Sequence, residues 1–411
     1  MARVLESAMV TCDEARAKVI ELVSQQRQPP PIETVPLEQS LGRVLAESVS
    51  ADRDYPPFHR ATRDGFAVRA ADLASVPAVL KRIGEIRAGQ SFAGTMGGGE
   101  CLQIMTGAPL PAGADAVLML EYAGVRDDQV AARRAVVPGE NVVPRGSEAR
   151  RGTTLLEPGR RISSVEVALL GQVGCAELRV FRRPRVAILS SGDEVVDIRD
   201  TPGPVQIRNS NSYSLAAQVA WHGGEPVRLG NVPDDVPALR EQMEAGLRED
   251  LLVLSGGVSM GKYDLVGVVL RQLGTEFYFD HVAIQPGRPT VFGRCRQKFV
   301  FGLPGNPVST LVTFELFVAP ALALLAGSTP PPLRFLRARL AETFRTKTGL
   351  KRFLPARLEG EGSDLSVRAL PWQGSGDLVA LAASDCFLVV PEDRAELPAG
   401  ELVDVLLRTP P

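Results

Sequence analysis

Residues 251–264 read Leu251-Leu252-Val253-Leu254-Ser255-Gly256-Gly257-Val258-Ser259-Met260-Gly261-Lys262-Tyr263-Asp264. The four leading apolar residues are typical of a strand that is buried on both faces. The two glycines after Ser255 permit a tight turn that exposes backbone N–H groups, and helical apolar spacing begins directly after Asp264. A strand, a glycine-rich turn and a helix start are the parts of a phosphate cradle in an open α/β sheet. An ordinary strand-to-helix connection has the same composition, so this stretch alone leaves both interpretations open.

The surrounding segment, 184–327, repeats the same alternation of strand and helix. Strands are expected at 186–189, 227–229, 251–254 and 299–302, with helices between and after them. This order predicts a parallel sheet with right-handed crossovers. Each predicted strand is followed by small or acidic residues, namely Gly192, Asp193 and Glu194; Asp234 and Asp235; Gly256, Gly257 and Asp264; and Gly305 and Asn306. Since ligands of open α/β sheets bind at the carboxyl edge, we expect a ligand site there.

Short apolar runs separated by Gly and Pro predict two small β-domains beside this core, one at 51–149 and a barrel-like one at 328–411. Helices are expected at 11–28, capped by Thr11, at 37–47, and at 162–173, capped by Ser163 or Ser164. We therefore expect residues 1–50 and 150–183 to form a helical linker region. The fold class is α/β multidomain, with a central open sheet flanked by two β-domains.

Composition excludes several classes of protein. A length of 411 residues predicts about three domains, and a net charge of −2 gives no support to nucleic-acid binding. The five cysteines are scattered, which argues against a zinc site or a disulfide framework and indicates a cytoplasmic protein. No targeting segment is expected at the N-terminus. The most membrane-like stretch, 311–327, contains Glu315 and Pro320, so we expect a buried helix and no membrane association.

The carboxylates at the sheet edge predict a Mg²⁺ site. Asp193, Glu194, Asp234 and Asp264 supply hard oxygen ligands, while Gly256 and Gly257 supply backbone N–H groups for phosphate. Mg²⁺ takes only one or two protein carboxylates, so not all four can be direct ligands. Asp264 also precedes a helix, and its simpler role is an N-cap.

Two candidate residues lie in the predicted first β-domain. Asp64 belongs to an Asp-Gly turn signal, and Thr106 lies in the loop Met105-Thr106-Gly107-Ala108-Pro109. Asp64 is either a turn former or an acidic site residue. Thr106 either satisfies its own turn or offers its hydroxyl to a ligand.

Five motifs occur in one order along the chain: residues 63–69 (Arg-Asp-Gly-Phe-Ala-Val-Arg), 105–109, 191–194 (Ser-Gly-Asp-Glu), 255–261 and 302–309 (Gly-Leu-Pro-Gly-Asn-Pro-Val-Ser). Together they resemble the molybdopterin molybdenumtransferase family, which includes the C-terminal domain of gephyrin. The resemblance covers essentially the whole chain. It implies an elongated homodimer of four-domain subunits that inserts molybdate into adenylylated molybdopterin with Mg²⁺ and releases AMP.

The resemblance also implies a site shared between subunits. Asp64 and Thr106 would complete the α/β site of the partner, where Glu194, Asp234 and Asp264 are catalytic. Other proteins of molybdenum cofactor biosynthesis would be further partners. The implied substrate-binding residues are Asp193, Gly256, Gly257, Ser259, His281, Gln285, Arg288, Pro304, Asn306, Pro307, Ser309 and Ser375.

The chain departs from the family pattern in one loop. The usual Lys-Pro-Gly-Lys-Pro is Gln285-Pro286-Gly287-Arg288-Pro289 here, and His281 stands where relatives often have a basic residue. An amide and a titratable imidazole thus replace two fixed ammonium charges. Molybdate is expected near Arg288, His281 and Ser309, although a lone histidine is often only structural.

Three rival functions are compatible with parts of the sequence. A molybdopterin adenylyltransferase would use the same kind of loops but would need only one α/β domain. A non-catalytic scaffold of the same fold would have lost the acidic residues, which are present. A generic nucleotidase would cleave unrelated anhydrides. The sequence does not distinguish molybdate from tungstate.

Overall fold

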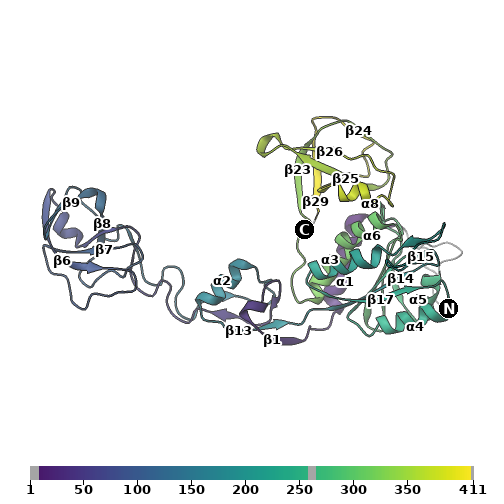
Figure 1. Ribbon diagram of the computed structural model, residues 1–411, viewed down its shortest axis with the longest axis horizontal. Helices are drawn as coiled ribbons and strands as arrows, with labels where there is room; N and C mark the ends of the chain where they lie inside the picture. Colours follow the sequence, from purple (N-terminus) through teal and green to yellow (C-terminus); the bar gives the residue numbers. More distant parts are fainter. Residues whose placement is uncertain (1–8, 258–264, 409–411) are drawn as a thin grey trace.

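The computed structural model describes residues 9–257 and 265–408. The molecule is elongated, with a β-domain at one end, a slender linker in the middle, and the α/β and C-terminal domains together at the other end (Figure 1). The predicted α/β core flanked by β-domains is confirmed. Two predicted site residues, Ser259 and Asp264, lie outside the described residues.

A six-stranded sheet in the order β17-β14-β18-β22-β21-β19 forms the centre of the α/β domain. Its strands are β14 (Arg185–Ser191), β17 (Glu225–Val232), β18 (Leu251–Ser255), β19 (Glu276–Phe279), β21 (Val291–Cys295) and β22 (Lys298–Leu303). Strands β17, β14, β18 and β22 are parallel, but β21 runs against β22. The four predicted strands are thus parallel, as expected, whereas β19 and β21, which the sequence did not predict, add an antiparallel edge. Arg296 and Gln297, both with positive φ, form a two-residue hairpin turn that reverses the chain between these strands.

Helices cover both faces of this sheet, as the continuous apolar strands predict. Alternate residues of β14 and β18 face opposite layers: Ile188 and Val253 join one apolar cluster, and Leu189 and Leu254 join the other. The helices of the first layer are α1 (Cys12–Gln26), α3 (Asn211–Trp221), α6 (Pro307–Thr313) and α7 (Ala319–Leu325), with the π-helical segment η4 (Phe314–Val318) between the last two. The second layer contains α4 (Val236–Gly246) and α5 (Leu265–Gln272).

The run Pro307–Leu325 is long and apolar enough to cross a membrane by length and composition, and 83% of its most apolar window is buried inside the molecule. Such burial is typical of a core helix. Helix α1 begins at the predicted cap, because Thr11 and Glu14 form a reciprocal capping box. This helix packs against α7 and η4, and so belongs with the α/β core rather than with the linker.

The linker contains more strand than the sequence predicts. Its elements are β1 (Ile32–Pro36), η1 (Leu37–Gln39), β2 (Val44–Leu45), β3 (Val49–Ser50), β12 (Thr154–Leu156), α2 (Ser164–Gln172) and β13 (Glu177–Phe181). The helix expected at 37–47 is wrong: only one 3₁₀ turn forms before Gly42, whose φ is +75°. Val44 and Leu45 instead pair with β13, so tertiary strand pairing overrides local helical propensity. Helix α2 is confirmed, with Ser163 and Glu166 in a capping box.

The β-domain is inserted into the linker. Its main sheet has the order β8-β5-β7-β6-β10-β9, and a short pair, β4 and β11, lies beside it. Its elements are β4 (Arg60–Ala61), β5 (Gly65–Val68), η2 (Ala70–Leu73), β6 (Ala78–Ile86), β7 (Glu100–Ile104), β8 (Ala116–Met119), η3 (Leu120–Tyr122), β9 (Ala123–Arg126), β10 (Gln129–Ala132) and β11 (Val142–Val143).

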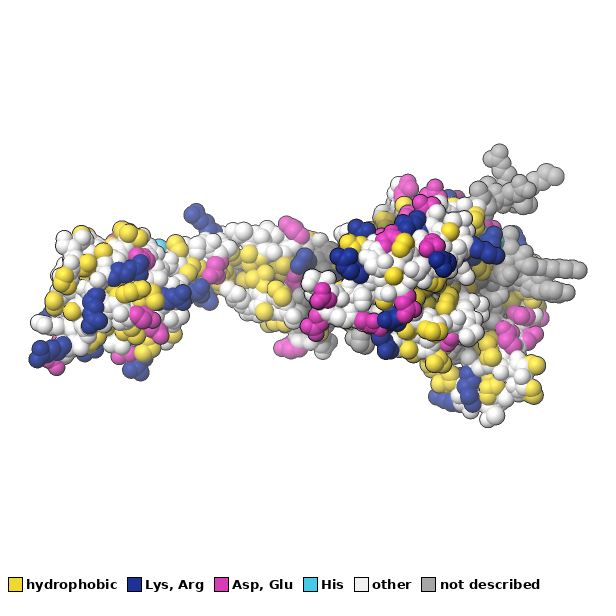
Figure 2. All heavy atoms as spheres, turned by 90° about the horizontal axis from the view of Figure 1, so that it is seen from above, with side chains coloured by type: hydrophobic (Ala, Val, Ile, Leu, Met, Phe, Trp, Pro, Cys, Tyr) yellow, Lys and Arg dark blue, Asp and Glu magenta, His cyan; other side chains and the backbone are white. Residues whose placement is uncertain are grey.

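On the face of the whole molecule shown in Figure 2, Lys and Arg side chains mix with Asp and Glu, without one large patch of positive charge.

The C-terminal domain is a closed β-barrel, because β25 pairs with both β26 and β27. Its elements are β23 (Phe335–Leu340), β24 (Phe344–Arg345), β25 (Lys351–Glu359), η5 (Gly362–Asp364), β26 (Ser366–Ala369), α8 (Leu378–Ala382), β27 (Cys386–Val390), β28 (Glu396–Leu397) and β29 (Leu402–Leu407). One short strand from the α/β segment, β20 (Ile284–Gln285), adds to β25 of this domain. The predicted anion loop that follows β20 is therefore anchored on both domains.

Candidate functional site

Four parallel strands end together at one edge of the central sheet. Ser191 of β14 is in register with Val232 of β17, and Ser255 of β18 is in register with Leu303 of β22. The loops after these strands carry the residues that the sequence marks for a ligand. The predicted carboxyl-edge site is therefore brought together in space by the sheet, while the roles of its residues stay predictions.

The turn after β18 is packed so closely that only glycine fits. Gly256 and Gly257 have φ values of +91° and +61°, which favour glycine. A Cβ on Gly256 would lie 2.7 Å from the Ser191 backbone oxygen, and a Cβ on Gly257 would lie 2.7 Å from Ser191 Oγ. Gly305, in the loop after β22, lies beside Gly256, because its Cβ would be 3.5 Å from the Gly256 Cα. Two bare backbone turns thus form one cradle at the sheet edge.

Three of the four predicted carboxylates lie at this edge. The backbone N–H of Asp234 donates to Asp193 Oδ1 at 3.1 Å, so the loops after β14 and β17 are in contact. Burial, together with the negative charges of Asp193 and Glu194, raises the pKa of Asp234. A carboxylate that resists ionisation beside two others is well suited to receive a cation or to accept a proton from a water.

Within residues 9–257 and 265–408, no group of three or more His, Cys, Asp or Glu side chains is arranged to hold a metal ion on its own. The residues present still fit Mg²⁺, which keeps several waters and uses only one or two carboxylates. The contact between the Asp193 and Asp234 loops is the observation that favours a cation here, because it gathers carboxylates at one edge of the sheet; burial and this neighbouring negative charge also raise the pKa of Asp234.

The loop after β22 joins the edge to the C-terminal domain. Asn306 Nδ2 donates to Ser375 Oγ at 2.7 Å, and the Val308 backbone N–H donates to the Ser375 backbone oxygen at 3.0 Å. Thr310 Oγ1 donates to the Pro304 backbone oxygen at 2.6 Å and holds the loop onto α6. Pro307 is the first residue of α6, and Ser309 lies buried in its first turn. Ser375, which is far away in sequence, is thereby part of the edge.

The predicted anion loop lies between the same two domains. Gln285 and Arg288 are exposed on either side of the buried Gly287. The φ of Gly287 is +113°, and a Cβ there would lie 2.4 Å from Thr313 Cγ2 of α6. His281 is half-buried, and its Nδ1 lies 3.2 Å from Asp280 Oδ1. This neighbouring carboxylate favours a structural role for His281 as much as an anion-binding one.

Asp64 and Thr106 contact each other in the inserted β-domain. The backbone N–H and the hydroxyl of Thr106 both donate to Asp64 Oδ1, at 2.7 and 2.9 Å, and these bonds lower the pKa of Asp64. Both residues are exposed. Their domain lies at the opposite end of the subunit from the central sheet (Figure 1), so one chain does not bring them to the edge by itself.

Two asparagines at the edge, Asn211 and Asn231, were not identified from the sequence as site residues. Asn231 Nδ2 donates to the Gly192 and Val195 backbone oxygens at 3.1 and 2.9 Å. Asn211, the first residue of α3, donates to Ser255 Oγ and to the Gly305 backbone oxygen. The only signal was the run Asn209-Ser210-Asn211, whose composition equally indicates a helix start. A polar cavity of about 470 Å³, lined by Asn209, Arg228 and Asn231 among others, opens beside these amides and is large enough for a small-molecule site.

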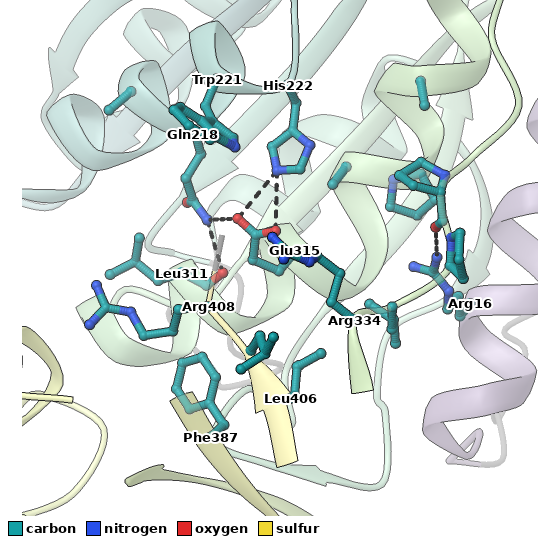
Figure 3. Close-up of a pocket in the computed structure, with 18 of the residues that line it drawn as sticks. Arg16, Gln218, Trp221, His222, Leu311, Glu315, Arg334, Phe387, Leu406 and Arg408 are labelled. Atoms are coloured by element: carbon teal, nitrogen blue, oxygen red, sulfur yellow. Dashed lines mark hydrogen bonds and ion pairs between the residues drawn. The ribbon is translucent and has the colours of Figure 1, made fainter. Parts of the chain in front are cut away.

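Another cavity, of about 510 Å³, lies between the C-terminal end of α3, the α6–α7 helix and the C-terminal domain (Figure 3). Glu315 lies at its wall and accepts hydrogen bonds from Gln218 Nε2 at 2.9 Å and from His222 Nε2 at 3.1 Å. Asn211 lies at the other end of α3, roughly 15 Å away along an ideal helix of this length. This cavity is therefore separate from the carboxyl edge.

The comparisons with known proteins cover nearly the whole chain. The family model described as the MoeA N-terminal region (domains I and II) matches residues 10–174, the probable molybdopterin binding domain matches 187–324, and the MoeA C-terminal region (domain IV) matches 337–407. The molybdopterin molybdenumtransferase of Synechocystis sp. is 35% identical over 374 residues, covering 90% of this chain and 93% of that protein. The enzyme of the same name from Bacillus subtilis is 33% identical over 410 residues, covering 97% of this chain and 94% of that protein.

A solved structure of the molybdopterin biosynthesis MoeA protein from Pyrococcus horikoshii OT3 is similar over 98% of this chain and 100% of that chain, with a TM-score of 0.81 and 30% identity. The resemblance found in the sequence motifs is thus confirmed over full-length relatives and over the fold. The chain belongs to the molybdopterin molybdenumtransferase family, also called the MoeA family.

Proposed function

We propose that this chain inserts molybdate into adenylylated molybdopterin and releases AMP. The observation that carries the proposal is the carboxyl edge, where the Gly256 and Gly305 turns lie beside Asp193, Glu194 and Asp234. Backbone N–H groups at glycine turns bind phosphate, and the carboxylates suit the metal ion that accompanies it. The transferase names of relatives matched over nearly their whole length support the same reaction.

Each group at the edge has a distinct task in this proposal. The turns at 256–257 and 304–307 hold the phosphates of the substrate. Asp193 and Glu194 would hold Mg²⁺, which when bound would offset the charge that develops on the AMP leaving group. Asp234, whose pKa is raised by burial and by its acidic neighbours, positions a water beside the phosphoanhydride and accepts its proton.

Molybdate is assigned to the loop between the two domains. Arg288 supplies a fixed positive charge, and Ser309 lies in the first turn of α6, where backbone N–H groups favour an anion. The departures Gln285 and His281 leave Arg288 as the main fixed charge of this loop.

The separation of Asp64 and Thr106 from the carboxyl edge supports a homodimer with shared sites. Asp64 and Thr106 contact each other and form a compact acidic group. All the other predicted site residues that the structure describes belong to the other end of the subunit, outside the inserted β-domain (Figure 1). A second subunit would bring this group to the carboxyl edge of the first. Other proteins of cofactor biosynthesis would then deliver or accept the pterin. All five cysteines are free, which supports a reducing compartment, and we place the protein in the cytoplasm.

The adenylyltransferase alternative is not favoured, because the match to transferase relatives includes both β-domains. The test is to incubate the purified protein with adenylylated molybdopterin, Mg²⁺ and molybdate, and to assay both AMP and active cofactor. AMP release without cofactor would contradict molybdate insertion and indicate a nucleotidase.

A pair of neighbouring aspartates provides a matched control. Asp234→Asn removes the proposed base and should lower cofactor formation by about 10²-fold. Asp235 caps α4, accepting from the Ala238 backbone N–H at 3.0 Å, and asparagine caps equally well. Asp235→Asn should therefore retain near-normal turnover.

A further inference from the structure

Two buried polar atoms beside the Gly256–Gly257 turn have no hydrogen-bond partner within the described part of the molecule. They are Ser191 Oγ, at the end of β14, and Asn211 Oδ1, at the start of α3. Buried polar groups are almost always paired in folded proteins, so each such atom needs an explanation. Both residues contact the cradle, although neither has a part in the mechanism above.

The orientation of the Asn211 amide is fixed by its contacts. Its Nδ2 donates to the Gly305 backbone oxygen at 2.7 Å and to Ser255 Oγ at 2.8 Å. A carbonyl oxygen can only accept, so exchanging the nitrogen and oxygen of the amide would place two acceptors against each other. The unpaired atom is therefore the oxygen, which is held in place and needs a donor.

The Ser191 hydroxyl lies against the part of the cradle where only glycine fits. Ser191 is 6% exposed, and a Cβ on Gly257 would lie 2.7 Å from its Oγ. A hydroxyl at this position can donate to an oxygen of an anion that rests on the glycine turn. Ser191, beside Gly257, and Asn211, bonded to Gly305, thus present a donor and an acceptor at the same cradle.

We propose that Ser191 and Asn211 are ligand-contacting residues of the nucleotide site. The Ser191 hydroxyl donates to a phosphate oxygen, and Asn211 Oδ1 accepts from an O–H group next to the phosphate. That O–H group belongs either to the ribose or to a metal-bound water. The inference deepens the proposed function and rests on it.

The test measures the affinity of the purified protein for AMP, the proposed product, by titration calorimetry with Mg²⁺. Ser191→Ala and Asn211→Ala each remove one unpaired atom. We expect each to weaken AMP binding about tenfold, the usual effect of losing one hydrogen bond to a ligand. Thermal melts on the same preparations report whether each variant is folded.

Two further unpaired buried atoms, Gln218 Oε1 and Thr275 Oγ1, provide matched controls. Gln218 is on the same helix as Asn211, and its amide likewise donates two bonds, to the Leu311 backbone oxygen at 3.2 Å and to Glu315 Oε1 at 2.9 Å (Figure 3). Thr275 precedes β19, away from the cradle. Gln218→Ala and Thr275→Val should therefore bind AMP within about twofold of the unaltered protein.

Ser255→Ala separates contacting the ligand from holding the cradle. This variant removes one acceptor of the Asn211 amide but leaves the Gly305 bond and the amide oxygen in place. We expect its AMP affinity to fall clearly less than that of Asn211→Ala. Equal losses would mean that Asn211 acts only by holding the turn, and would overturn its assignment as a ligand contact.

The remaining outcomes are distinct. If the unaltered protein binds AMP and both site variants bind it equally well, the inference is wrong and the proposed function stands. If the unaltered protein does not bind AMP, the proposed function itself is contradicted, and the inference with it. Repeating the titration in EDTA identifies the group that donates to Asn211 Oδ1. If Asn211→Ala still binds AMP more weakly than the unaltered protein, the donor is a ribose hydroxyl. If the difference in AMP affinity disappears, the donor is a metal-bound water.

Discussion

The side-chain amide of Asn306 lies 2.7 Å from the hydroxyl of Ser375, and this bond fixes a loop of the C-terminal barrel to the carboxyl edge of the central sheet. A second bond, from the Val308 backbone N–H to the Ser375 backbone oxygen, joins the same two loops. The barrel is therefore positioned on the candidate site itself.

Ser375→Ala should affect catalysis more than folding. The backbone bond remains, so we expect the melting temperature to change little, while cofactor formation falls several-fold because the loop loses its side-chain contact. Thr343→Val is the control, since the Thr343 hydroxyl accepts from the Ala399 backbone N–H within the barrel. Equal activity in both variants would show that the Asn306–Ser375 bond is dispensable.

Mixing two inactive variants should restore activity if sites are shared between subunits. Asp64→Ala damages the β-domain end of the site, and Asp234→Ala damages the sheet edge. Random exchange of subunits would leave roughly a quarter of the sites with both residues intact. Cofactor formation is measured before and after exchange, with exchange verified by differently tagged subunits. Complete exchange without recovered activity would argue for a site within one subunit.

Gly287→Ala should displace the anion loop. Alanine at this position would be strained by the φ of +113° and would also meet Thr313 Cγ2 at 2.4 Å. Gly349→Ala provides the comparison, because its φ is +98° but no atom lies within 4 Å of the added Cβ. We expect both variants to lose stability and only Gly287→Ala to lose molybdate affinity, since Arg288 is the next residue. Equal molybdate binding in the two would place the anion elsewhere.

Glu166 should make the linker sensitive to acid. Its carboxylate accepts hydrogen bonds from Ser163, and from Arg160 Nη2 at 2.6 Å, and these bonds lower the pKa of Glu166 from 4.5 to about 2. Because the folded-state pKa is depressed, the stabilisation is complete above pH 4.5 and is lost as the pH falls toward 2. The shift from 4.5 to about 2 corresponds to no more than about 3.5 kcal/mol.

Glu166→Gln retains the capping pattern but removes the charge. Its free energy of unfolding should be lower than that of the unaltered protein at pH 7, and the difference should shrink below pH 4.5. Denaturant unfolding at pH 7 and at a pH below 4.5 measures the free energy of unfolding of both proteins. Glu38→Gln changes an exposed carboxylate of the same linker and serves as the control, which should have no such effect. If Glu166→Gln lowers the free energy of unfolding equally at all pH values, the cause is steric.

Much of the α/β domain was predictable because its signals are local. The apolar run before Ser255, the capping box of Thr11 and the glycine turns each specify one element without help from distant residues, as the capping box of Ser163 does in the linker. The carboxyl edge followed from strand order alone, because parallel strands end on the same side. The Mg²⁺ ligands and the substrate contacts remain predictions.

The features that were missed depend on distant partners. Val44 and Leu45 are in a strand because β13, more than a hundred residues later, pairs with them. Asn211 meets Ser255 and Gly305 only after three loops converge, and no local pattern distinguishes it from a helix-start asparagine. The reversal of β21 depends on the two positive-φ residues Arg296 and Gln297, neither of which is glycine.

Two chain segments connect the inserted β-domain to the rest of the subunit, one through β3 and β4 and the other through β11 and β12. The two segments lie side by side, because β4 pairs with β11 and β3 pairs with β12. Such a connection acts as a lever arm. Because the β-domain that carries Asp64 lies at the opposite end of the subunit from the central sheet (Figure 1), a small rotation at the linker would produce a large displacement of Asp64 relative to the glycine cradle. If Asp64 completes the site of a partner subunit, as proposed above, linker residues such as Tyr55, whose hydroxyl donates to the Gln172 backbone oxygen at 2.9 Å, would influence how often Asp64 reaches that site without changing nucleotide affinity.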